Sequence, residues 1–154
     1  MKILVCISQT PDTTAKIKFN ADQTQLDVNG VQFTMNPYAE WYALVRAIEL
    51  KEQLGGDVTV LHVGPAANDP TIRKALAIGA DNAVRIDSEA SGSLFVAKQI
   101  AEFAKSENYD IIFFGKETID YNGSEVPAMV SELLDLPFVS YGSELTMNSN
   151  VATI

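Results

Sequence analysis

One polar stretch, GKETIDYNGSEVP (residues 115–127), has the composition of a ligand-binding loop. It follows an apolar run, YDIIFF, and precedes a run with helical character, AMVSELLDL. Glycine lets a backbone approach a ligand closely, and the free N–H groups at the start of a helix suit a phosphate. The stretch matches neither G-x-G-x-x-G nor the P-loop G-x-x-x-x-G-K-[ST]. These residues alone leave a nucleotide loop and a simple connecting loop equally open.

The other chemically capable side chains favour structural roles. Cys6 lies in an apolar run, which predicts a packed thiol rather than a reactive one. His62 is the only histidine, so it makes neither a metal site nor a Ser-His-Asp triad, and a structural role is expected. Lys116 suits a phosphate partner or a solvated position equally well. Asp120 could accept from a ribose hydroxyl or from N–H groups of its own loop.

The elements that would position these residues alternate along the chain. Short apolar runs predict strands, and longer amphipathic runs, opened by Asn36-Pro37 or Asp69-Pro70 and ended by glycine, predict helices. This alternation of strands and helices predicts an α/β fold with a Rossmann-like, doubly wound and mostly parallel sheet. The expected strands are 2–8, 57–63, 82–86 and 109–115, with one or two more in 137–147. The expected helices are 36–54, 71–78, 93–108 and 127–136.

A small β-hairpin excursion is expected after the first strand. Two β-like runs, residues 16–19 and 25–34, lie there, and Asn29-Gly30 within the second is a turn signal.

The ligand crevice of such a sheet lies beyond the carboxyl ends of its strands. Four segments are expected to meet there. They are residues 6–10, 36–39, 62–65 and 115–127.

Composition narrows the class of protein. The chain has 154 residues, which suits one domain, and a net charge of −9, which disfavours nucleic acid. A single cysteine allows no internal disulfide and suits a reducing compartment. The start, MKILVCIS, lacks a signal-peptide pattern, and no apolar run has membrane-spanning length. A cytoplasmic protein is therefore expected.

The end of the chain is predicted to form a β-hairpin. Residues 144–147 and 151–154 resemble strands around an Asn-Ser-Asn turn, and the chain stops there. The expectation is a single nucleotide-binding α/β domain over 1–154 that lacks a C-terminal portion of the full subunit.

Several motifs, taken in order, resemble the β subunit of electron transfer flavoproteins. They are KILVCIS, KIKF, MNPYAEWYALVRAIELKE (35–52), TIRKALAIGAD (71–81), GKETID (115–120) and ELLDLPFVSY (132–141). No single motif is specific, but their order and spacing run along the whole chain. The resemblance implies a carrier rather than an enzyme, paired with an α subunit that makes most contacts to a redox-active FAD. It further implies dehydrogenase donors and a pocket in this chain for AMP or a second FAD.

The resemblance also assigns site residues. It places Cys6 beside the adenine, Asn36, Pro37, Tyr38 and Ala39 at a ribose and base segment, and Val63 at a strand-end contact. The phosphate-side loop would comprise Gly115, Lys116, Ile119, Asp120, Gly123, Ser124, Glu125 and Val126.

Three dipeptides depart from the family pattern. Ser8-Gln9 stands where many members have a basic pair, Tyr121-Asn122 replaces an acidic or glycine-acidic pair, and Ser124-Glu125 replaces an amide-bearing pair. Glu125 beside a phosphate would repel it unless it pointed away or bound a ribose hydroxyl.

Two other functions stay open. One is a stand-alone adenine-nucleotide-binding protein of the universal-stress type, although its glycine spacing is missing from residues 115–127. The other is an ATP-using transferase or hydrolase, for which the sequence offers no catalytic motif.

Overall fold

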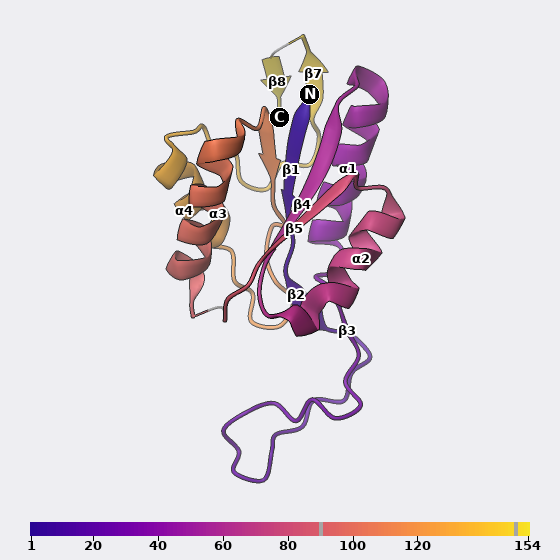
Figure 1. Ribbon diagram of the computed structural model, residues 1–154, viewed down its shortest axis with the longest axis vertical. Helices are drawn as coiled ribbons and strands as arrows, with labels where there is room; N and C mark the ends of the chain where they lie inside the picture. Colours follow the sequence, from indigo (N-terminus) through magenta and orange to yellow (C-terminus); the bar gives the residue numbers. More distant parts are fainter. Residues whose placement is uncertain (90, 150) are drawn as a thin grey trace.

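A four-stranded parallel sheet forms the centre of the computed structural model, which describes residues 1–89, 91–149 and 151–154. The strands lie in the order β5-β4-β1-β6 (Figure 1). Ile3 of β1 pairs with Val58 of β4 on one side and with Ile111 of β6 on the other. The strand order therefore reverses between β1 and β6. The strands are β1 (Lys2–Cys6), β4 (Asp57–Val63), β5 (Asn82–Ile86) and β6 (Ile111–Phe113).

Helices cover both faces of the sheet, α1 and α2 on one side and α3 and α4 on the other (Figure 1). Neighbouring residues of β1 point to opposite faces, so Ile3 and Val5 enter the first core and Leu4 and Cys6 the second. This confirms the predicted α/β, Rossmann-like doubly wound architecture. The helices are α1 (Ala39–Leu54), α2 (Asp69–Ile78), α3 (Ser93–Glu107) and α4 (Val126–Leu134), with a short 3-10 turn, η1 (Ala66–Asn68), before α2.

The excursion after the first strand is an antiparallel hairpin whose connection extends away from the sheet (Figure 1). Its paired strands are β2 (Gln9–Pro11) and β3 (Phe33–Met35). The expected runs 16–19 and 25–34 touch only through a bridge between Phe19 and Leu26. The excursion is thus confirmed. Its paired strands, however, lie nearer the sheet than the runs 16–19 and 25–34 that were expected to pair.

One local prediction is wrong, and another is confirmed only in part. Asn36 does not cap α1, because the cap position is Tyr38, at a φ of 63°, and the Asn36 side chain bonds elsewhere. Within 137–147, where one or two strands are expected, a strand forms only at the end, from Thr146 onward. Residues 137–141, all of them described, form none, and Phe138 and Val139 are about half exposed. An apolar run with β-propensity forms a strand only where a neighbouring strand is available to pair with it.

The last described segments form a separate pair of antiparallel strands, β7 (Thr146–Asn148) and β8 (Val151–Thr153), as predicted. Asn150, which the sequence places in the turn between them, lies outside the described residues. No helix in the described part of the chain is long and apolar enough to cross a membrane.

Candidate functional site

A cavity of about 510 Å³ opens at the carboxyl ends of β1, β4 and β6 and at the start of α4. Its volume is in the range of small-molecule sites. Its position is the point where the strand order reverses, which is where open α/β sheets bind their ligands. Residues 6–10, 62–65 and most of 115–127 do meet there, as the sequence predicts.

The inner wall of the cavity is mainly apolar. Cys6 and Val63 come from the sheet, Val96 and Ile100 from α3 and Val126 from α4. Burial raises the pKa of the Cys6 thiol well above its ordinary value, so the thiol stays protonated and packs as an apolar group. Such a wall suits the flat, apolar faces of an aromatic ring.

One hydroxyl in the wall has no partner. Thr10 is fully buried, lines the cavity, and its Oγ1 has no hydrogen-bond partner among the described residues. A buried polar group without a partner is destabilising, and because Oγ1 itself is buried, it is not open to a ligand in the cavity.

Glu40 lies at the base of the cavity and joins α1 to the end of β1. The Ser8 backbone N–H donates to Glu40 Oε2 at 2.7 Å, and the Ser8 hydroxyl donates to Oε1 at 2.6 Å. Burial, with a smaller contribution from the charge of Asp120, raises the Glu40 pKa to about 8, although the Ser8 bonds act in the opposite direction. Gly115 packs directly against it, since a Cβ there would lie 2.6 Å from Glu40 Cγ.

Asn36 ties the loop of residues 115–125 to the start of α1. It is fully buried, its Nδ2 donates to the Glu117 carbonyl at 2.8 Å, and its Oδ1 accepts from the Ile119 N–H at 3.0 Å. This amide therefore positions the loop rather than facing the cavity.

His62 has the structural role that the sequence suggests. Its Nδ1 lies 2.9 Å from the Ile7 carbonyl, and its Nε2 lies 2.9 Å from Asn68 Nδ2. A carbonyl can only accept, so Nδ1 carries the hydrogen and Nε2 accepts from the amide. Burial, and to a smaller extent the charge of Arg85, lowers the His62 pKa, so the ring is neutral.

The cavity brings together half of the residues that the resemblance assigns. Those lining it are Cys6, Val63, Gly115, Asp120, Gly123, Glu125 and Val126. The others do not line it; they are Asn36, Pro37, Tyr38, Ala39, Lys116, Ile119 and Ser124.

Among those outside the wall, Tyr38 is 65% exposed and Lys116 turns to other partners. Lys116 Nζ lies 3.0 Å from Glu117 Oε1 and 4.9 Å from the ring centroid of Tyr141. A phosphate contact from Lys116 would require it to leave both partners.

Sequence reasoning missed Glu40 and Asn68 as residues of the cavity wall. Glu40 had a usable signal, because it directly follows the segment 36–39 that is expected at the ligand edge. Asn68 had none, since a polar residue in a turn is ordinary.

Comparisons with known proteins agree with the resemblance. A family model described as "Electron transfer flavoprotein domain" matches residues 24–154. The chain is 33% identical to electron transfer flavoprotein subunit beta of Homo sapiens, over 97% of this chain and 61% of that protein. It is 34% identical to the mitochondrial subunit beta of Arabidopsis thaliana, over 100% of this chain and 62% of that protein. With subunit beta of Thermoanaerobacterium thermosaccharolyticum the identity is 35%, over 92% of this chain and 55% of that protein.

The chain therefore spans about three fifths of the length of these relatives. The matches do not favour the universal-stress alternative.

Proposed function

The chain belongs to the electron transfer flavoprotein family, and from this premise we propose that it acts as a β subunit. Together with an α subunit it would carry electrons through FAD from dehydrogenases to a downstream acceptor. The observation that carries this proposal is the cavity at the reversal point of the sheet. It is lined by segments in which the resemblance to β subunits is found.

The pocket of this chain would hold AMP or a second FAD. The apolar wall fits an adenosine group. Cys6, Val63 and Val126 would lie against the adenine and ribose, while the loop containing Gly115, Asp120 and Gly123 would close over it. FAD, when bound with the α subunit, would supply the redox chemistry, and this chain would bind and orient nucleotide.

The protein would thus be an electron carrier rather than a catalytic enzyme. We place it in the cytoplasm, a proposal supported by its single buried cysteine.

Co-expression with an α subunit tests the assignment. The purified complex should show a yellow flavin absorption band, and an acyl-CoA dehydrogenase with its substrate, or NADH, should bleach it. The chain purified alone should be colourless, because most contacts to the redox-active FAD would come from the α subunit.

One result would count against the proposal. It is a co-expressed complex without flavin together with tight ATP binding by the lone chain, which would restore the universal-stress alternative. Stoichiometric FAD on the isolated chain would overturn only the expected lack of colour, and it would favour a second FAD over AMP in this pocket.

A further inference from the structure

The chain has two Asn-Gly dipeptides, Asn29-Gly30 and Asn122-Gly123. We propose that Asn29 is a site of spontaneous deamidation in the folded protein, and that the fold protects Asn122 from the same reaction. The modified site lies in the hairpin connection, residues 12–32 between β2 and β3. The proposal goes beyond the proposed function and depends on no ligand or partner.

The reaction needs only an asparagine side chain, the next peptide nitrogen and water. The peptide nitrogen of the following residue gives its proton to solvent and attacks Cγ of the asparagine. As the ring of the succinimide closes, the bond from Cγ to Nδ2 breaks, and Nδ2 takes up a proton and leaves as ammonia. Water then opens the ring at either carbonyl, which gives aspartate or isoaspartate without oxidation or reduction. Glycine in the following position hinders the attack least, because it has no side chain.

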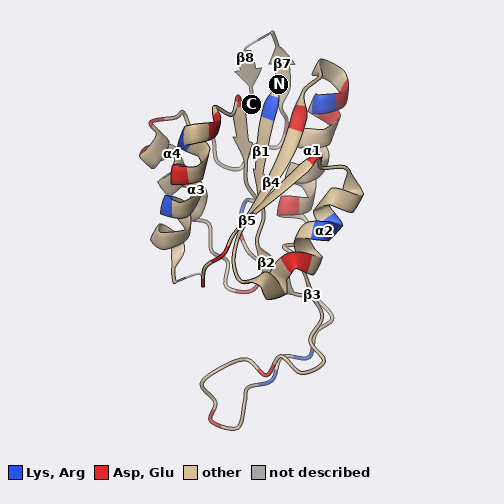
Figure 2. Ribbon diagram, viewed as in Figure 1, with Lys and Arg blue, Asp and Glu red and all other residues tan. Residues whose placement is uncertain are grey.

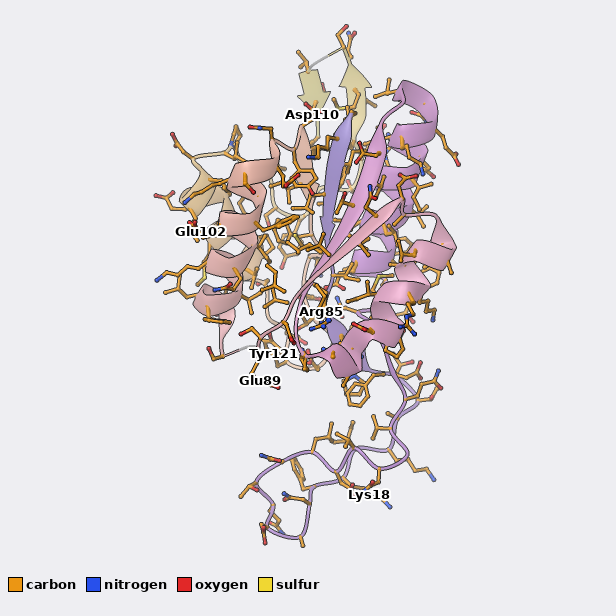
Figure 3. The ribbon with its side chains drawn as sticks, viewed as in Figure 1. Lys18, Arg85, Glu89, Glu102, Asp110 and Tyr121 are labelled. Atoms are coloured by element: carbon orange, nitrogen blue, oxygen red, sulfur yellow. The ribbon has the colours of Figure 1, made fainter. Side chains whose placement is uncertain are left out.

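Asn29-Gly30 lies in an exposed turn at some distance from the sheet. The turn spans Val28 to Val31, and the Val31 N–H donates to the Val28 carbonyl at 3.1 Å. Asn29 and Gly30 are both exposed, and a Cβ on Gly30 would meet nothing within 4 Å. The connection that carries this turn, and on which Figure 3 labels Lys18, extends away from the domain. Water and base therefore have free access to this dipeptide.

The attacking nitrogen of this dipeptide is not engaged. Among the described residues, the Gly30 N–H has no hydrogen-bond partner. The Asn29 side chain is held by Asp27 alone, whose Oδ1 accepts from Nδ2 at 2.7 Å and from the Asn29 N–H at 3.1 Å. Both bonds are exposed and join residues two positions apart. Exposed local bonds of this kind open easily, so the turn can rearrange for the attack.

Asn122-Gly123, in contrast, is fixed within its loop. The Gly123 N–H, which would have to attack, donates to Thr118 Oγ1 at 3.2 Å. The Asn122 N–H donates to the Thr118 carbonyl at 2.9 Å, and the Gly123 carbonyl accepts from the Thr118 N–H at 3.0 Å. A Cβ on Gly123 would collide with the ring of Tyr121, which Figure 3 labels at the lower end of the sheet. Several contacts must therefore open together before the Gly123 nitrogen can reach Asn122.

Deamidation of Asn29 would change the charge of the hairpin connection. Between residues 16 and 29, Lys16 and Lys18 balance Asp22 and Asp27, and Figure 2 shows both signs of charge on this connection. A new carboxylate at position 29 would give this neutral stretch a net negative charge. It would also add one negative charge to the −9 of the whole chain.

Incubation of the purified chain in mildly alkaline buffer, followed by peptide mapping with mass spectrometry, tests the proposal. The peptide with Asn29 should convert to aspartate and isoaspartate with first-order kinetics. Asn122 should convert at least about tenfold more slowly, because the hydrogen bonds of its loop must open first. In guanidinium chloride, where the fold is absent, the two dipeptides should react at similar rates.

Two threonine variants test the reason for the difference. Thr118→Val removes the acceptor of the Gly123 N–H, so it should speed the reaction of Asn122 about threefold and leave that of Asn29 unchanged. Thr14→Val is the matched control, since the Thr14 hydroxyl donates to Asp12 and contacts neither dipeptide. It should change neither rate.

A charge measurement checks the site independently. Ion-exchange chromatography of the incubated chain should resolve a more acidic species, and Asn29→Gln should remove it, because the larger ring that glutamine would form closes much more slowly.

In the folded chain, conversion of Asn122 as fast as that of Asn29 would overturn the proposal. An Asn29 that stays intact in the folded chain but reacts in guanidinium chloride would overturn it as well, since the turn would then protect this dipeptide.

Discussion

The protonation state of Glu40 depends on the fold. It is 5% exposed, and both of its carboxyl oxygens accept hydrogen bonds from Ser8. Asp120 faces it from the loop after β6 and disfavours a second negative charge there. A carboxyl group in such a place keeps its proton well above its usual pKa.

Replacing Glu40 with Gln should flatten the dependence of stability on pH. The folded protein keeps this proton up to about pH 8, whereas the unfolded chain releases it near 4.5. Between these values the folded state binds more protons, so its free energy of unfolding falls as the pH rises, by something on the order of 4 kcal/mol. In Glu40→Gln, which mimics the protonated form, this component should disappear. Urea denaturation at several pH values between 5 and 9 measures it.

Glu49→Gln provides the control, since Glu49 lies on the same helix but is half exposed. It should keep the slope of the parent protein. An identical slope in Glu40→Gln and the parent would show that Glu40 is ionised throughout this range.

At the scale of elements, α1 carries much of the first core through one face. Leu44 and Leu50 are almost fully buried, whereas Leu54, at the end of the same helix, is 48% exposed. Helical periodicity places the first two against the sheet, and Gly55 ends the helix just beyond Leu54.

Leu44→Ala should lower the free energy of unfolding by about 2–5 kcal/mol, since it opens a cavity between α1 and the sheet. Leu54→Ala, which removes the same atoms at an exposed position, should cost less than about 1 kcal/mol. Urea denaturation monitored by the fluorescence of Trp41 compares them. Equal costs would mean that α1 does not pack as the structure has it.

At the scale of the whole molecule, the hairpin connection stands apart from the domain (Figure 1). Phe19 and Val28 in it are more than half exposed, and no residue of 16–29 lines the cavity. The sheet and its two cores are assembled without this segment.

Replacing residues 16–29 with a short glycine-containing turn should therefore change the free energy of unfolding by less than about 1 kcal/mol. AMP affinity should also stay the same. Urea denaturation and calorimetric titration with AMP test both. A loss of several kcal/mol, or of AMP binding, would show that residues 16–29 support the domain.

Local signals in the sequence determined the order of strands and helices, the ends of α1 and α2 at Gly55 and Gly79, and the hairpin after β1. They could do so because periodicity and glycine act over a few residues. The same signals were insufficient for residues 137–141, where strand formation requires a partner.

The interior of the site was decided only by the tertiary structure. Glu40 meets Ser8 across 32 residues, and Asn36 reaches Glu117 and Ile119 across 81 and 83. The pairing of strands in the order β5-β4-β1-β6 brings these distant segments to one edge. The spacing of residues along the sequence does not indicate such contacts, because burial and hydrogen-bond partners are properties of the folded chain as a whole.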